Sequence, residues 1–303
     1  DLECSSCQKG AVEQPSGRAA NRRSTPQKGS HSGQRLRLPA MSSMKPLRKF
    51  RPFKLVAKKT MTEGSESNHP IRQLTFELPA DVSLQLLGFD LGLGDFVQVK
   101  PPEGRVRSYS PTSPQDRLGS FDITVKIYPN GRCSGYLDSL QVGEEAQISG
   151  PAPVPWMAYT LNQRETVGVI AFGVGITEAL LVAQAQLSKP NVEQVSLLWG
   201  NKQWDDVFWQ TELDSLKVQH SGRFQLTLAL SREDHEGCVR SRIDSKLLQQ
   251  VFGGFPKSAA FLVVGTKRMR METFAALSAQ GFQQPPLLEK KLVPPWLWRR
   301  GLW

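Results

Sequence analysis

The sequence predicts an antiparallel β-barrel followed by a doubly wound parallel α/β sheet. Short strands separated by turn residues fill the first half of the chain, which is typical of a barrel that closes on itself. In the second half, strands too continuously apolar to be half exposed alternate with helical stretches. With 303 residues, 39% of them hydrophobic, the chain can bury two cores. We expect a disordered basic segment at 1–48, a barrel domain at 49–155 and an α/β domain at 156–303.

The basic segment and the first strand after it account for the whole net charge of +10. Fourteen Lys and Arg against three acids give residues 1–62 a charge of +11, which leaves −1 for the remainder. Such a segment is an organelle transit peptide, an unstructured tail, or sequence upstream of a start at Met41. It has no aromatic residue before Phe50, so nucleic-acid binding is not predicted. We expect a cytoplasmic or organellar protein.

Cysteine and histidine do not form a metal-binding pattern in this sequence. Cys4 and Cys7 form a lone C-x-x-C, while Cys133, Cys238 and the four histidines are scattered. No apolar run is long enough to span a bilayer. The C-terminal segment PPWLWRRGLW contacts a membrane surface or a partner, or it packs against the sheet.

The strands of the barrel follow a clear order from Phe53 to Gly150. Residues 121–128 alternate strictly between apolar and polar, so one face packs inward and the other, with Lys126 and Tyr128, is predicted to face a ligand. The predicted strands are FKLVAKKTM, IRQLTFELP, GDFVQVKPP, RVRSYSPTS, FDITVKIY and EAQISGP. Prolines 151, 153 and 155 mark a linker that ends near Arg164.

The segment RVRSYSPTS and the later GRCSGYLDSL carry groups that suit a dinucleotide flavin. Arg107 can bind a phosphate bidentately, and Tyr109 can lie along the ribityl chain. Gly131 permits a tight turn, and Ser134 is predicted to cap the helix GYLDSL, whose free N–H groups attract an anion. Together these elements predict a flavin pyrophosphate site.

The second half alternates strands with helices. The strands are TVGVIAFG, EQVSLLWG, RFQLTLALS and AAFLVVG, and the helices are TEALLVAQAQL, WDDVFWQTELDSL, SRIDSKLLQQVF and METFAALSAQG. After the first strand, Gly173 and Gly175 permit a tight turn, and Ile176 and Thr177 open a helix that favours a nucleotide phosphate. Ligands of such sheets bind beyond the carboxyl ends of the strands.

Two further pairs of residues follow predicted strands, at the same carboxyl edge of the sheet. Ser231 and Arg232 suit a ribose phosphate and slightly favour NADPH, although Glu233 and Asp234 follow them. Lys267 and Arg268 hold phosphate or belong to a solvated loop.

The order RxYSPTS, VKIYPNG and GxxSxxL resembles the ferredoxin-NADP reductase superfamily, most nearly its cytochrome-b5 reductase branch, from about Phe53 to Phe282. The resemblance implies FAD, NADH or NADPH, and hydride transfer followed by single-electron transfer to an acceptor protein such as a cytochrome-b5-type haem protein. It places Ser110 near flavin N5 and Thr177 between the two cofactors, as the catalytic pair. The remaining cofactor-binding residues are Arg107, Ser108, Tyr109, Thr124, Lys126, Tyr128, Gly131, Arg132, Cys133, Ser134, Gly173, Gly175, Ile176, Ser231, Arg232 and Gly265.

The sequence departs from the family pattern at two places. Glu178 stands where the family has proline, and Val264-Gly265-Thr266 stands where it has Cys-Gly-Pro. Cytochrome-b5 reductases generally prefer NADH, whereas Ser231-Arg232 is similar to the plant-type reductases. An alternative function is therefore a degenerate FAD-binding regulatory or partner-binding protein that does not turn over a pyridine nucleotide.

Overall fold

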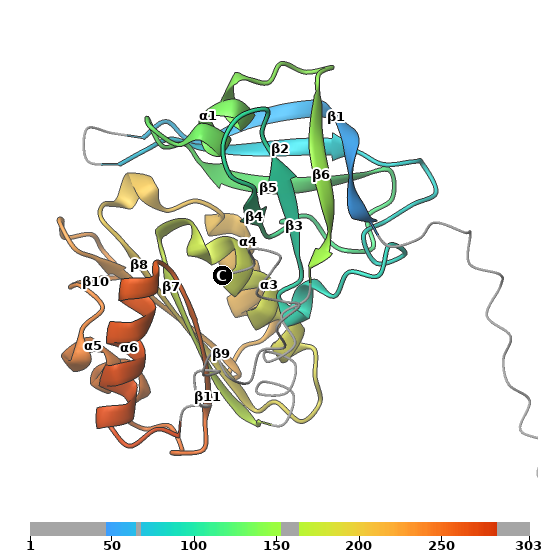
Figure 1. Ribbon diagram of the computed structural model, residues 1–303. Helices are drawn as coiled ribbons and strands as arrows, with labels where there is room; N and C mark the ends of the chain where they lie inside the picture. The colour runs from blue at the N-terminus through green and yellow to red at the C-terminus, as the bar shows by residue number, and fades with distance from the viewer. Residues whose placement is uncertain (1–46, 65–67, 153–163, 284–303) are drawn as a thin grey trace, which may run out of the picture. The chain divides into compact units, whose positions relative to one another are not determined.

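The computed structural model describes residues 47–64, 68–152 and 164–283 (Figure 1). The basic N-terminal segment, Cys4 and Cys7, most of the predicted linker and the Trp-rich C-terminal segment lie outside these residues, as does the boundary predicted at 155–156.

The first half is a six-stranded antiparallel sheet with the order β4-β3-β6-β1-β2-β5. β1 is long enough to pair with β6 through its first half and with β2 through its second, with register shifts in both pairings. The strands are β1 (Leu47–Thr62), β2 (Ile71–Glu77), β3 (Phe96–Lys100), β4 (Arg107–Tyr109), β5 (Ser120–Lys126) and β6 (Glu145–Ala152). This confirms the predicted antiparallel architecture.

The sheet closes between β5 and the segment that follows β4. Pro111 forms an isolated bridge with Ile123, and the Thr112 N–H donates to the Asp122 carbonyl at 2.8 Å. Such closure removes free sheet edges. Both faces of β5 are covered, because Asp122 and Thr124 are buried as well as the apolar residues that alternate with them. The prediction of an open face along this strand is therefore wrong up to residue 125.

The second half is a five-stranded parallel sheet with the order β10-β9-β8-β7-β11. It comprises β7 (Thr166–Phe172), β8 (Gln194–Asn201), β9 (Phe224–Leu230), β10 (Cys238–Arg240) and β11 (Ala260–Val264). Four of these strands match the apolar runs of the sequence. The edge strand β10 was not predicted, because its three residues CVR are too few for a periodic signal.

Helices cover both faces of this sheet (Figure 1). α3 (Ile176–Leu187) and α4 (Gln210–Gln219) share one buried cluster with it, and α5 (Ser245–Phe252) and α6 (Lys267–Ala279) share the other. α4 begins six residues later than predicted, because residues 204–206 form the 3-10 turn η3 and Trp209 before α4 adopts a left-handed conformation, φ 60°. A bulky residue with positive φ is a strained backbone position.

Candidate functional site

The RxYS segment lies in β4, where its register is set by β3. Tyr109 pairs with Val97 and Arg107 with Val99. Tyr109 packs against the barrel core, and its hydroxyl lies beside the Cys133 thiol. Burial, followed by the neighbouring Cys133, raises the pKa of Tyr109 far above its usual range, so the phenol stays neutral. Arg107 is exposed, as is Ser108, and the Arg107 guanidinium donates to the Val106 carbonyl at 3.2 Å.

The second flavin element is α1 (Arg132–Ser139), which begins three residues earlier than predicted. Gly131 is its N-cap, and a Cβ there would lie 2.2 Å from Ser134 Oγ, so a larger residue would displace the Ser134 hydroxyl. Ser134 is therefore not the cap. Its hydroxyl lies in the first turn, accepts from the Tyr128 N–H at 3.2 Å and donates to the Gly131 carbonyl at 3.2 Å. This bonding fixes the turn that leads into the helix.

The Tyr109–Cys133 contact joins these two elements. Cys133 is the second residue of α1 and is buried, with its thiol also 4.0 Å from the Val99 carbonyl of β3. Burial raises the pKa of Cys133, which makes it an inert thiol at neutral pH. Arg132, at the start of α1, lies over Gly104 in the loop before β4. The structure thus brings the predicted Tyr109 and Cys133 together and places the predicted Arg132 beside Gly104.

The residues after β5 form a third group. Lys126 bonds Asn68 and is attracted by Asp206, while burial lowers the Lys126 pKa. Tyr128 is 48% exposed, and its ring meets His69 edge to face at 5.2 Å between centroids. Thr124 is instead buried, with its hydroxyl 3.0 Å from the Thr112 hydroxyl. Its assignment to the flavin stays a prediction. Lys126 and Tyr128 are more exposed to solvent than Thr124.

The glycine turn lies at the carboxyl end of β7, as predicted. Gly173–Gly175 form the 3-10 turn η2, with Gly173 at φ +53°, and α3 follows directly. The Thr177 hydroxyl donates to the Val174 carbonyl at 2.9 Å. A Cβ on Gly175 would lie 2.8 Å from the Val264 carbonyl, so the turn packs tightly on the end of β11. This packing needs glycine at 175.

The two departures from the family pattern meet beside this turn. Val264 is half-buried at the end of β11, and Thr266 caps α6 by accepting from the Met269 N–H at 3.4 Å. Glu178 lies in the first turn of α3. Burial, opposed by the Arg270 charge, raises the pKa of Glu178 to about 7.

The candidate ribose site lies where β8 and β9 end side by side. The N–H groups of Ser231 and Arg232 donate to the carbonyls of Asn201 and Lys202, at 3.1 and 3.0 Å. The Glu233 carboxylate accepts from the Trp204 N–H at 2.5 Å, and Asp234 pairs with Arg240 at 2.5 Å. Both acids that follow Arg232 are therefore engaged elsewhere.

Sequence reasoning missed several aromatic residues at this edge. The Trp204 and His235 rings stack at 3.8 Å between centroids, and the buried Trp199 indole donates to the Gly173 carbonyl at 2.8 Å. The apolar run that contains Trp199 did not indicate which acceptor its indole would bond, because that acceptor follows the neighbouring strand β7 and is distant in the sequence. Tryptophan in a predicted buried strand was the available signal, since its N–H needs an acceptor.

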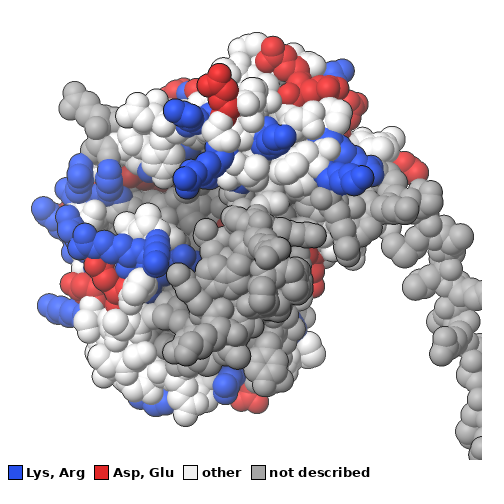
Figure 2. All heavy atoms as spheres, viewed as in Figure 1, with Lys and Arg blue, Asp and Glu red and all other residues white. Residues whose placement is uncertain are grey.

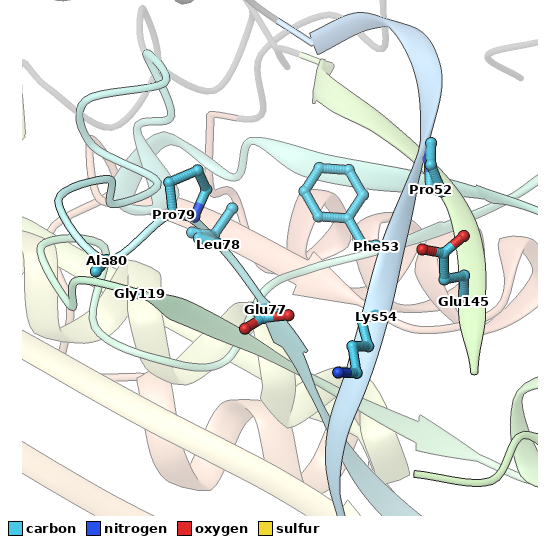
Figure 3. Close-up of a pocket in the computed structure, with 9 residues that line it drawn as sticks. All are labelled: Pro52, Phe53, Lys54, Glu77, Leu78, Pro79, Ala80, Gly119 and Glu145. Atoms are coloured by element: carbon cyan, nitrogen blue, oxygen red, sulfur yellow. The ribbon is translucent and has the colours of Figure 1, made fainter. Parts of the chain in front are cut away.

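A separate hollow of about 560 Å³ lies on the barrel (Figure 3). Lys54 in β1 lies between Glu77 and Glu145 there, among the lining residues Pro52, Phe53, Lys54, Glu77, Leu78, Pro79, Ala80, Gly119 and Glu145. None of the predicted site residues lines it. Within the described residues, no group of three or more His, Cys, Asp and Glu is arranged to hold a metal ion, and no helix is long and apolar enough to cross a membrane.

Two family models match the chain. The oxidoreductase FAD-binding domain matches residues 58–154, and the oxidoreductase NAD-binding domain matches residues 169–276. These ranges include the flavin elements and the glycine turn.

Curated relatives and solved structures agree with this division. NADH-cytochrome b5 reductase 1 of Candida glabrata is 31% identical over 249 residues, which span 80% of this chain and 83% of the relative. NADH--cytochrome b5 reductase 1 of Arabidopsis thaliana is 29% identical over 60% of this chain and 63% of its own length. The cytochrome b5 reductase domain of Ulva prolifera nitrate reductase shares the fold, with a TM-score of 0.63, 21% identity and coverage of 79% and 96% of the two chains. The ferredoxin NADP+ reductase of Neisseria gonorrhoeae, solved with FAD and NADP, has a TM-score of 0.62, 18% identity and coverage of 80% and 95%.

Proposed function

The chain belongs to the NADH-cytochrome b5 reductase family of FAD- and NAD-binding oxidoreductases, and we propose that it transfers electrons from a nicotinamide dinucleotide through FAD to a cytochrome-b5-type haem protein. The observation that carries the proposal is the Tyr109–Cys133 contact, because it joins the RxYS strand to the helix that starts at Gly131. The Arg107 guanidinium, the Tyr109 phenol and the N-terminus of α1 therefore lie close together.

The residues at this end fit FAD. Gly131 leaves room where a Cβ would collide with Ser134, and the first N–H groups of α1 have no acceptor within the helix. The exposed Arg107 supplies a guanidinium for the pyrophosphate, and Tyr109 supplies a phenol whose ring the barrel core holds in place. Ser110, directly after β4, is the proposed donor toward the flavin ring.

The chain's own residues hold and orient the two cofactors. When bound, FAD accepts a hydride and releases electrons singly. The Gly173–Gly175 turn and the N-terminus of α3 would receive the nucleotide phosphates, and Thr177, whose hydroxyl is tied to Val174, would lie at the nicotinamide. Lys126, partly buried and drawn to Asp206, adds a positive charge at the end of β5.

The ribose site supports NADPH as a donor. Glu233 accepts from the Trp204 N–H and Asp234 pairs with Arg240, so both carboxylates that follow Arg232 already have partners. The exposed Arg232 can then bind a ribose phosphate. The relatives above are named for NADH, so the two nucleotides must be compared directly.

The acceptor surface that we propose is the first two turns of α6. Every side chain from Thr266 to Glu272 is exposed, including Lys267, Arg268 and Arg270, with Met269 39% and Met271 53% exposed. Figure 2 shows Lys and Arg gathered on the side of the α/β half where α6 and β10 lie. The positive end of the α6 dipole adds to these charges. An acidic haem protein complements such a surface.

Anaerobic absorbance titration tests the function. Purified protein reconstituted with FAD is titrated with NADH and, separately, with NADPH, and bleaching of the flavin band shows reduction. Oxidised cytochrome b5 is then added, and its haem spectrum reports electron transfer. A flavin band that neither nucleotide bleaches would contradict the proposal and favour a degenerate flavin-binding protein. Bleaching without haem reduction would contradict only the acceptor.

A further inference from the structure

We propose that Trp199 is a positioning residue for the nicotinamide nucleotide, because its indole N–H holds the Gly173 carbonyl and so orients the peptide group between Gly173 and Val174. The inference rests on the proposed function, since it assumes that the η2 turn receives the nucleotide. It adds a residue outside the turn to the machinery that binds the donor.

The contact is well defined. Trp199 lies in β8, next to β7, and is fully buried at 0% exposure. Its Nε1 donates to the Gly173 oxygen at 2.8 Å, which is a strong hydrogen-bond distance. The same oxygen accepts from the Ile176 N–H that begins α3. Both lone pairs of this carbonyl are thus used, one inside the turn and one by the neighbouring strand.

Fixing this carbonyl also fixes an N–H group. The peptide bond is planar and trans, so the Val174 N–H points opposite to the Gly173 carbonyl, away from the buried indole. Gly173 has φ +53° and lacks a Cβ, so its own backbone preferences hold the peptide plane only weakly. The indole bond supplies that restraint. Val174 is itself partly exposed, so a nucleotide can approach the turn.

Packing holds the indole itself in place. Phe208 meets the Trp199 ring edge to face at 5.5 Å and 87°, and Trp209 meets Phe208 at 4.8 Å. Trp199, Phe208 and Trp209 thus form a column of rings, in which Trp209 adopts its left-handed conformation. Strained residues persist where their surroundings determine them, so the column is a rigid support. A Phe or Leu at 199 would fill much of the space but would lack the donor.

Trp199→Phe tests the role of the donor. The readouts are the Kd for NAD+ and NADP+ from flavin difference spectra, KM and kcat with each reduced nucleotide, the FAD content and the melting temperature. We expect both Kd values and both KM values to rise about three- to ten-fold, the effect of one lost hydrogen bond, with FAD content unchanged. Both nucleotides should be affected alike, because the turn contacts the part that they share.

Phe224→Leu is the matched packing control, because Phe224 of β9 is buried in the same cluster as Trp199. It should lower the melting temperature without changing the nucleotide Kd. Should Trp199→Phe fail to fold, 3-benzothienylalanine at position 199 replaces the indole N–H with sulfur at nearly the same shape.

The outcomes separate the inference from the function on which it rests. Unchanged Kd values in Trp199→Phe, or in the benzothienylalanine protein, overturn the inference while wild-type reduction by nucleotide still supports the reductase. An equal loss of affinity in Phe224→Leu shows general packing and also overturns it. Wild-type protein that binds neither nucleotide overturns both.

Discussion

Arg117 binds the buried carboxylate of Asp122 bidentately, its two terminal guanidinium nitrogens donating to the two oxygens at 2.9 and 2.7 Å. Thr75 and Gln73 of β2 donate to the same carboxylate, at 2.7 and 3.0 Å. Because Asp122 also receives the Thr112 N–H at its carbonyl, this ion pair lies where the barrel closes, shortly after the RxYS segment. The pair therefore stabilises both the barrel and the segment that carries Ser110.

Arg117→Ala should destabilise the protein by about 3 kcal/mol, because it leaves a buried carboxylate without its counter-charge. Urea unfolding measures the change, and FAD retention should fall with it. Arg268→Ala is the control, since Arg268 pairs with Glu272 on the exposed face of α6 and its loss should leave the unfolding midpoint unchanged. A midpoint that stays constant in Arg117→Ala would show that Thr75 and Gln73 satisfy Asp122 alone.

Arg107→Ala should abolish tight FAD binding, because the pyrophosphate loses a guanidinium that bonds it bidentately. The measurement is the flavin-to-protein absorbance ratio after gel filtration. Arg105→Ala removes a neighbouring exposed cation outside β4 and should retain FAD. Full flavin occupancy in Arg107→Ala would contradict the assignment of this strand to the pyrophosphate.

Arg232→Ala should raise KM for NADPH about ten-fold or more and spare NADH, because only NADPH carries the ribose phosphate. Steady-state kinetics with both donors measure the ratio. Arg242→Ala removes another exposed arginine of the same region and should leave the ratio unchanged. Equal effects of Arg232→Ala on both donors would exclude a ribose-phosphate contact.

Glu178 should make the protein less stable as the pH rises from about 4.5 to about 7. In this window the folded state keeps the Glu178 proton while the unfolded state has lost it, so the free energy of unfolding falls, by roughly 3 kcal/mol in all. Glu178→Gln should remove this dependence and be the more stable protein at pH 8. Urea titrations at pH 5, 6, 7 and 8 measure the difference, and parallel curves for both proteins would show that Glu178 titrates normally.

The two-part architecture and the positions of the motifs could be predicted from the amino-acid sequence. Alternation along residues 121–128 and the apolar runs before Gly173 and Gly265 identified strands, because side-chain periodicity follows backbone geometry directly. The RxYS segment and the glycine turn were identified from local residue chemistry, and both lie at the strand and strand end predicted for them.

The contacts between side chains could not be predicted in this way, because they depend on long-range packing. The burial of Thr124 depends on Thr112, whose segment pairs along β5. The Tyr109–Cys133 contact depends on β4 lying beside α1, and the Trp199–Gly173 bond depends on the neighbouring positions of β8 and β7. The N-cap of α1 is Gly131 and not the predicted Ser134, because the Ser134 hydroxyl accepts from the Tyr128 N–H of the preceding turn. Such contacts join residues far apart in the chain or compete with local capping preferences, so periodicity and local propensity carry no record of them.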